Sequence, residues 1–240
     1  MLYSSATHQG SRSNNEDFFG IATIENDLLL IIADGLGGHN AGEVASKLAV
    51  DVVLRTIKDL WEDTSHPLEK LSISFRKAND EIITLSKNNP SFAGMGTTIV
   101  IALVMGKSIF LANVGDSRAY IVTNNSIEQI TKDHSFVQSL VDIGAIDKEE
   151  AFTHSQKNIV LQSLGSKESI KPDFYEIEMK NDDLLLLCTD GLSDVLKDSE
   201  ILEVCHDSCT RDIVPNMLVN AVLKKGAKDN ITVVCYWQDI

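Results

Sequence analysis

The fold is decided by the stretch Leu28-Leu29-Leu30-Ile31-Ile32-Ala33-Asp34-Gly35-Leu36-Gly37-Gly38-His39. Its six consecutive apolar residues, Leu28 to Ala33, predict a strand that is buried on both faces. The strand ends at Asp34, where closely spaced glycines permit a tight turn and a close approach of the backbone. A carboxylate packs poorly in this place but suits a hard cation as an oxygen ligand. Since Asp-Gly is also a common turn, the stretch alone leaves a plain strand and loop equally open.

The residues before this stretch predict a hairpin. A strand over 18–24, a polar turn over 25–27 and the strand over 28–33 pair in a register that places Asp17 opposite Asp34, within one residue. Two carboxylates then meet at one end of the hairpin. Because like charges repel, this arrangement costs free energy unless a cation lies between them.

The rest of the chain alternates between strand and helix patterns. Helical spacing covers 43–61, 67–87, 198–205 and 213–223, and strand patterns cover 97–104, 108–114, 119–122, 127–130, 174–179, 183–188 and 231–237. The pattern changes over residues 135–165, which we call the flap, and the part over 152–165 has no clear period. Ser135 with Gln138, and Asp147 with Glu150, resemble capping boxes that open short helices. The flap is either a lid over a site or a surface insertion. We expect an α+β domain in which helices cover sheet faces.

Composition and charge limit the class of protein. Of the 240 residues, 43% are hydrophobic and 23% charged, so the chain can bury a large core and is not disordered. A formal net charge of −14 argues against nucleic acid or an anionic membrane as a partner. We expect no membrane span and no signal peptide. The four cysteines contain no C-x-x-C pair, which favours buried thiols over a zinc site or disulfides and predicts a cytoplasmic protein.

Carboxylates recur at strand ends along the chain. Asp34, Asp116 and Asp190 each follow a predicted strand, Asp229 precedes one, and Asp17 lies opposite Asp34. Together these carboxylates fit a site for two or more oxygen-loving ions such as Mg²⁺ or Mn²⁺. Two such ions, about 3.5–4 Å apart, can deprotonate a shared water and hold a phosphoryl group for in-line attack.

The same residues stand in motifs that resemble one known family. In chain order, the motifs are Arg12 with Asn15-Glu16-Asp17, Ala33 to His39 with Gly42-Glu43, Gly94-Met95-Gly96-Thr97-Thr98, Gly115-Asp116-Ser117-Arg118, Thr189-Asp190-Gly191 and Asp229-Asn230-Ile231-Thr232. This set resembles the metal-dependent protein Ser/Thr phosphatases of type 2C, in their bacterial branch, over nearly the whole chain.

The resemblance implies both a fold and an activity. The fold is a four-layer α-β-β-α sandwich, two antiparallel β-sheets flanked by helix pairs, with metals in a cleft at one end. A single catalytic domain would span residues 1–240. The activity is the hydrolysis of phosphoserine and phosphothreonine in proteins, by a water that a binuclear metal centre activates without a phosphoenzyme.

The resemblance also implies which residues hold the two core ions, Mn²⁺ or Mg²⁺. Asp34 would bridge both ions, and the backbone carbonyl of Gly35 would bind one of them. Asp190 and Asp229 would complete the coordination of the first ion.

Further roles follow from the same resemblance. Glu16 and Asp17 would act on the second ion mainly through water, with a purely supporting role as the alternative. Asp116, with Asp190, would serve a possible third ion; the alternative is that Asp116 caps a turn through Ser117 and Arg118. Arg12 would grip the substrate phosphate with two N–H groups, and its alternative is a surface salt bridge to Glu16.

Two positions depart from the family pattern. Leu36 stands where animal members carry a histidine proposed as general acid, so we assign no side-chain acid and leave protonation to metal-bound water. Bacterial relatives often read His-Pro-x-Arg-Asn in the flap, whereas this chain reads His154-Ser155-Gln156-Lys157-Asn158. That difference leaves the stiffness of the flap and the substrate preference open. We interpret His39 and His134 as structural.

Two rival functions remain at this point. A pseudophosphatase would bind phosphopeptides without turnover, but replaced ligands, its signature, are absent from the motifs. A metal-dependent phosphodiesterase or nuclease is the second rival, and the net charge of −14 and the lack of a basic, aromatic-lined stretch argue against nucleic acid as its substrate. The expected partners are phosphorylated proteins, substrates of a Ser/Thr kinase, with no nucleic acid and no membrane, and with a monomer as the default state.

Overall fold

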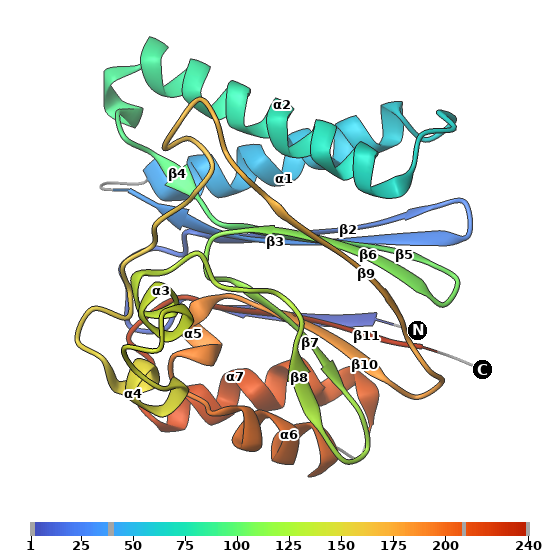
Figure 1. Ribbon diagram of the computed structural model, residues 1–240, viewed down its shortest axis with the longest axis vertical. Coiled ribbons are helices and arrows are strands. Elements are labelled where there is room, and N and C mark those ends of the chain that lie inside the picture. Colours follow the sequence, from blue (N-terminus) through green and yellow to red (C-terminus); the bar gives the residue numbers. More distant parts are fainter. Residues whose placement is uncertain (1–2, 38–40, 208–209, 239–240) are drawn as a thin grey trace.

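The structure is a computed structural model that describes residues 3–37, 41–207 and 210–238. Two antiparallel β-sheets lie face to face, and a pair of helices covers the outer face of each sheet (Figure 1). The predicted four-layer α-β-β-α sandwich is confirmed. The interpretation of His39 lies outside the described residues, as does Cys209. No helix among the described residues has both the length and the apolar character of a membrane span.

The first sheet contains the hairpin that the sequence predicts. Its strand order is β2-β3-β5-β6-β9, and the short strand β4 pairs with the end of β3. The strands are β2 (Asp17–Ile24), β3 (Asp27–Leu36), β4 (Gly96–Thr97), β5 (Ile99–Met105), β6 (Ser108–Val114) and β9 (Asp173–Glu178). Asp17 pairs with Asp34 in the register of β2 and β3, as predicted.

The second sheet has the strand order β1-β11-β10-β7-β8. Its strands are β1 (Tyr3–His8), β7 (Arg118–Val122), β8 (Ile127–Gln129), β10 (Leu184–Cys188) and β11 (Ile231–Trp237). The sequence predicts no strand before residue 18, so β1 is an addition. Its small polar residues give no apolar alternation, and it forms because its backbone pairs with β11 at the edge of the sheet.

Two helix pairs cover the sheets. Helices α1 (Ala41–Asp59) and α2 (Pro67–Asn88) pack on the first sheet, and α6 (Asp198–Asp207) and α7 (Val214–Lys224) pack on the second. The short 3₁₀ helix η1 (Pro90–Phe92) follows α2 in the sequence, and η2 (Arg211–Ile213) lies between α6 and α7. Helix α1 begins and ends two residues before the helix that the sequence predicts over 43–61. Leu60 and Trp61, the last residues of the predicted helix, form hydrogen-bonded turns after α1.

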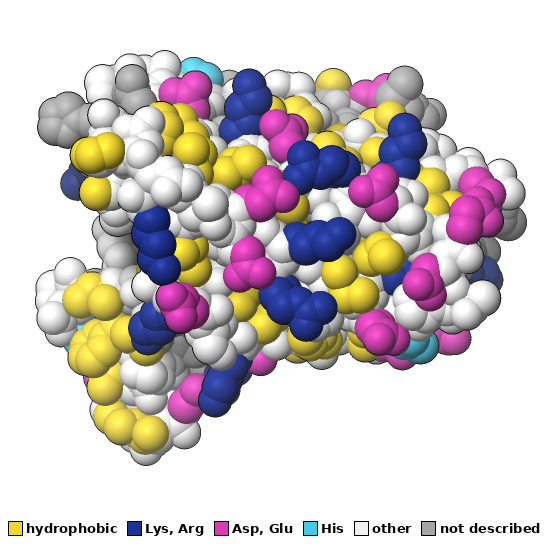
Figure 2. All heavy atoms as spheres, turned by 90° about the horizontal axis from the view of Figure 1, so that it is seen from above, with side chains coloured by type: hydrophobic (Ala, Val, Ile, Leu, Met, Phe, Trp, Pro, Cys, Tyr) yellow, Lys and Arg dark blue, Asp and Glu magenta, His cyan; other side chains and the backbone are white. Residues whose placement is uncertain are grey.

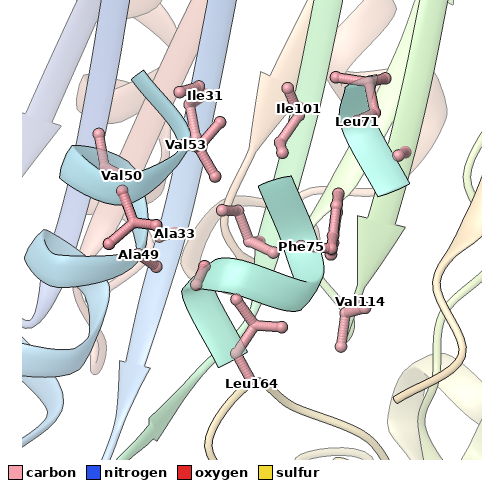
Figure 3. Close-up of a cluster of buried hydrophobic side chains, with 14 of the residues drawn as sticks. Ile31, Ala33, Ala49, Val50, Val53, Leu71, Phe75, Ile101, Val114 and Leu164 are labelled. Atoms are coloured by element: carbon pink, nitrogen blue, oxygen red, sulfur yellow. The ribbon is translucent and has the colours of Figure 1, made fainter. Parts of the chain in front are cut away.

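Side chains along β3 alternate between the two faces of the first sheet, as strand geometry requires. Leu29, Ile31 and Ala33 pack against α1 and α2, and Figure 3 shows Ile31 and Ala33 beside Val50 and Val53 of α1. The intervening Leu28, Leu30 and Ile32 pack against the second sheet. All residues from 29 to 33 have 0% exposure, so the prediction of a strand buried on both faces is confirmed.

The flap carries two short helices, α3 (Phe136–Asp142) and α4 (Lys148–Thr153). Asp147 and Glu150 form the predicted capping box at α4. Ser135 caps α3 by accepting a hydrogen bond from the backbone N–H of Gln138, without the reciprocal half of a box. Figure 1 places α3 and α4 at one end of the sandwich, beside the single-turn helix α5 (Asp190–Ser193).

Candidate active site

Strand ends bring the predicted carboxylates together at one end of the sandwich. Asp17 begins β2 and pairs with Asp34 near the end of β3. Asp116 follows β6, Asp190 begins α5 with one residue between it and the end of β10, and Asp229 precedes β11. The charges of the other four all act on Asp34. We call these five residues the carboxylate cluster.

Burial and mutual repulsion raise the pKa values in the carboxylate cluster. Burial is the largest cause for Asp34, followed by the charge of Asp17, and its pKa lies well above the usual range. Burial raises the pKa of Asp17 to about 7 and that of Asp190 to about 7, and it raises the pKa of Asp116 well above the ordinary value. A cation among these groups would relieve both the repulsion and the cost of burying charge.

The cluster has oxygen atoms to offer a metal ion. Asp17 Oδ1 and Asp190 Oδ1 are buried and have no hydrogen-bond partner, and buried polar atoms of this kind are rare. Within the described ranges, no three His, Cys, Asp or Glu side chains form a ready-made ligand set. A complete set of protein ligands is not required, because Mg²⁺ keeps several waters and takes only one or two carboxylates from a protein. The residues therefore fit divalent ions whose coordination water completes.

Hydroxyl groups hold Asp17 in place. The Thr189 hydroxyl donates a hydrogen bond of 2.8 Å to Asp17 Oδ2 and accepts one from the backbone N–H of Thr232. The Thr232 hydroxyl also bonds that of Thr7 at 2.8 Å. The sequence predicts no role for these threonines, although Thr189 and Thr232 stand in the motifs around Asp190 and Asp229. Their spacing along the chain carried no signal that they converge on Asp17.

A second hydroxyl network fixes Asp34. The backbone N–H of Asp34 donates to the Thr98 hydroxyl, which lies 2.7 Å from the Ser117 hydroxyl. The Asp34 carbonyl accepts hydrogen bonds from the Thr98 N–H and the Thr97 hydroxyl. Thr98 thus links the end of β3 to the residue that follows Asp116.

Close packing at Gly35 brings three segments together. The Gly35 N–H donates to the carbonyl of Glu16, and a Cβ at Gly35 would collide with the backbone of Gly42 and Glu16. The Glu16 carbonyl also accepts a 2.6 Å hydrogen bond from the Ser46 hydroxyl. The close backbone approach that the glycines predict is confirmed at this position.

Asn230 organises the loop that carries Arg12. Its side-chain oxygen accepts a hydrogen bond from the Glu16 N–H, and its amide nitrogen donates to the carbonyls of Gln9 and Asn14. Arg12 itself pairs with Asp229 at 2.6 Å and is 56% exposed. The predicted alternative for Arg12 is a surface salt bridge to Glu16. Arg12 does form a surface salt bridge, but with Asp229 instead of Glu16.

Comparison with known proteins identifies the family. A model of the protein phosphatase 2C family matches residues 5–225. The chain belongs to this family. It is 36% identical over 236 residues to the serine/threonine phosphatase stp of Listeria monocytogenes serotype 4b (strain F2365), covering 95% of this chain and 92% of that protein.

Solved structures agree with this assignment. The serine/threonine phosphatase Stp1 from Staphylococcus aureus superposes with a TM-score of 0.91 at 39% identity, covering 99% of this chain and 95% of the other. The catalytic domain of the serine/threonine protein phosphatase PstP, solved with two manganese ions, gives a TM-score of 0.85 at 35% identity, with 98% and 96% coverage. This member of the type 2C family is a metal-dependent protein Ser/Thr phosphatase that acts on phosphoproteins, and nothing favours the pseudophosphatase.

His134 and Arg118 of this phosphatase are engaged in structural bonds. His134 Nδ1 accepts from the backbone N–H of Gly115, and its Nε2 lies 3.2 Å from Asp173 Oδ2, in line with a structural role. Arg118 forms a bidentate pair with Asp133. The Arg118 side chain bonds Asp133 and the Ser117 hydroxyl bonds Thr98, so neither side chain is engaged with Asp116. The alternative in which Asp116 caps a turn stays a prediction.

Proposed function

We propose that the phosphatase reaction takes place at the carboxylate cluster, with two Mn²⁺ or Mg²⁺ ions bound there. The observation that supports this most strongly is the pair of buried, unpartnered oxygens on Asp17 and Asp190, inside a group of mutually repelling carboxylates. When bound, such ions supply activation of water and neutralisation of the phosphoryl charge.

Each residue of the site then has a defined task. Asp34 would contact both ions, and the Gly35 carbonyl would contact one of them. Asp190 and Asp229 would complete the coordination of the first ion. Glu16 would serve the second ion.

Asp17 would act on the second ion through its free oxygen, Oδ1, because Thr189 engages the other oxygen. Asp116, buried beside Asp190, would serve a third ion.

Arg12 would bind the phosphate of the substrate. Its guanidinium offers paired N–H donors that match two phosphate oxygens, and its exposure leaves it accessible to an incoming phosphoprotein. In the structure one of its nitrogens bonds Asp229, a proposed metal ligand. Arg12 would therefore turn from that carboxylate to the phosphate when ion and substrate bind.

We propose that the substrates are proteins phosphorylated by a Ser/Thr kinase and that residues 1–240 act as one catalytic domain. The face over α2 shows acidic and basic side chains interspersed, without a basic patch on that side (Figure 2). The absence of nucleic acid and membrane partners stays a prediction. The monomeric state, the cytoplasmic location and the choice between Mn²⁺ and Mg²⁺ stay predictions.

Calorimetric titration with Mn²⁺ tests the metal site without using activity as the readout. Wild type should bind at least two ions, and Asp190→Asn and Asp229→Asn should each weaken the first ion by more than about tenfold, since each removes a charged ligand. Asp80→Asn, on the exposed side of α2, is the matched control and should bind Mn²⁺ as wild type does. Equal Mn²⁺ binding by all four proteins would contradict the proposed site.

A further inference from the structure

A pocket of about 350 Å³ opens directly beside the carboxylate cluster. Asp116 and Asp190 lie in its wall, so it is continuous with the place where we put the reaction. Residues of the flap helices α3 and α4 also line it. Its volume falls at the lower end of the range of sites for small ligands, roughly 300–1,000 Å³.

Apolar side chains from three segments line the pocket. Val137 and Val141 come from α3, Phe152 comes from α4, and Leu196 follows α5. Val137 and Leu196 are buried, whereas Val141 and Phe152 are half-buried and so present part of their surface. A pocket of this kind gains free energy by taking up apolar surface from water.

Charged side chains also line the pocket, and three of its four basic residues are in ion pairs, Arg118 with Asp133 and two more at the rim; the fourth is Lys148. Lys157 Nζ lies 3.2 Å from Asp194 Oδ2, and Lys197 Nζ lies 2.5 Å from Glu149 Oε2. Both ammonium groups also lie over the ring of Phe152, at 5.3 and 5.6 Å from its centroid. Because most of these basic groups are already paired, the pocket offers little free positive charge to an acidic ligand, and its apolar side chains are the surface on which an uncharged apolar group gains most.

We propose that this pocket, which we call the flap pocket, takes an apolar side chain of the substrate protein near the phosphorylated residue. The phosphate would reach the carboxylate cluster while a neighbouring leucine-like side chain enters between α3, α4 and Leu196. The flap pocket would thereby select phosphorylation sites that have an apolar flank. This inference rests on the proposed function, because the carboxylate cluster anchors the phosphate end of the peptide.

Matched phosphothreonine peptides test the flap pocket. Each position near the phosphothreonine carries leucine, serine, aspartate or lysine in turn, and kcat/KM is measured with Mn²⁺. Wild type should prefer leucine over serine by about tenfold or more at one position, as expected for an apolar side chain in a fitted pocket. The quantity compared between proteins is this leucine-to-serine ratio, so a general loss of activity in a variant cancels.

Two variants should abolish the preference by different means. Val141→Asp introduces a charge into the flap pocket and Val141→Phe fills it, so the ratio should fall close to one in each. Ile143→Asp makes the same chemical change two residues away, at a side chain that is 76% exposed and outside the pocket lining, and it should keep the wild-type ratio.

Several results would overturn the inference. They are an absent leucine preference in wild type, an equal effect of Val141→Asp and Ile143→Asp, and a preference for aspartate that Lys148→Met removes. p-Nitrophenyl phosphate, which has no flanking residue, separates the two proposals. If wild type hydrolyses it with Mn²⁺ but shows no leucine preference, only the flap pocket fails; if it hydrolyses neither this ester nor any peptide, both proposals fail.

Discussion

The Thr98 hydroxyl lies between two carboxylate-bearing segments at the centre of the site. It accepts a hydrogen bond from the Asp34 N–H and bonds the Ser117 hydroxyl, and the Thr98 side chain is fully buried. Removing the hydroxyl would leave two buried polar groups without a partner, which is more costly than the loss of an exposed bond.

We therefore predict that Thr98→Val lowers the free energy of unfolding by about 1–3 kcal/mol. Thr98→Ser keeps the hydroxyl and is the control, which should retain the bonds and lose only the contribution of a methyl group. Urea denaturation of the three proteins measures the difference. A Thr98→Val protein as stable as wild type, or one destabilised less than Thr98→Ser, would contradict the role of the hydroxyl, because valine keeps the methyl group.

Arg12 differs from Thr98 because its ion pair with Asp229 lies at the surface. Exposed ion pairs contribute roughly 0–1 kcal/mol to stability, so Arg12→Ala should leave the free energy of unfolding within about 1 kcal/mol of wild type. Loss of phosphate binding should lower kcat/KM about ten- to hundredfold. Arg12→Lys should recover only part of this, since an ammonium cannot bind two oxygens in a fork. Full recovery by lysine would contradict bidentate binding.

Local sequence predicted the positions of the carboxylates but not the bonds that hold them. Turn position fixes the register of a hairpin, which is why Asp17 opposite Asp34 is confirmed. The contacts of Thr189 with Asp17 and of Asn230 with Gln9 join residues far apart in the chain. They depend on how the two sheets are stacked, and a pattern read along one segment contains no such information.

At the scale of the elements, α4 is tied to the segment after α5. Lys157 bonds both the carboxylate and the carbonyl of Asp194, and its ammonium lies over the ring of Phe152. The lysine that replaces the arginine of the family pattern in the flap therefore still joins the flap to the body of the protein.

Lys157→Met should remove these bonds while keeping much of the side-chain volume. We predict faster amide hydrogen exchange in residues 136–160, with a global free energy of unfolding within about 1 kcal/mol of wild type, because the pair is partly exposed. Lys87→Met, at an exposed ion pair on α2, serves as control and should leave exchange in the flap unchanged. Flap exchange that is the same in both variants and wild type would show that Lys157 does not restrain α4.

Elements with a strong apolar period were predicted from it, and the short helices α3 and α4 were predicted from their capping residues. The last strand, over 231–237, agrees with β11 at both ends because every side chain in it is buried. β1 and α5 were missed for different reasons. β1 depends on backbone pairing alone, and in α5 the Asp190-Gly191 pair has the appearance of a turn. A Cβ at Gly191 would overlap the carbonyl of Asn230, so tertiary packing determines that residue.

For the whole molecule, the carboxylate cluster predicts how stability depends on pH and metal. Without ions, the folded state holds protons on Asp17 and Asp190 up to about pH 7, whereas unfolded aspartates lose theirs near pH 4. Between these values the folded state binds more protons, so stability must fall as the pH rises.

The melting temperature in EDTA should therefore be higher at pH 5.5 than at pH 8. Mn²⁺ should raise it more at pH 8, where protons no longer compete for the carboxylates. Differential scanning calorimetry at both pH values, with and without Mn²⁺, measures this. A melting temperature in EDTA that increases from pH 5.5 to pH 8 would contradict the assigned burial of the cluster.

The most direct test of the central claim is phosphate release from a phosphothreonine peptide by wild type and Asp34→Ala, each with Mn²⁺ and with EDTA. We predict turnover by wild type with Mn²⁺ only, and a loss of at least about a hundredfold in Asp34→Ala, since Asp34 is the ligand proposed to contact both ions. Turnover in EDTA, or unchanged turnover in Asp34→Ala, would contradict a metal-dependent reaction at the carboxylate cluster. So would a wild-type protein that binds the peptide tightly and releases no phosphate at any Mn²⁺ concentration.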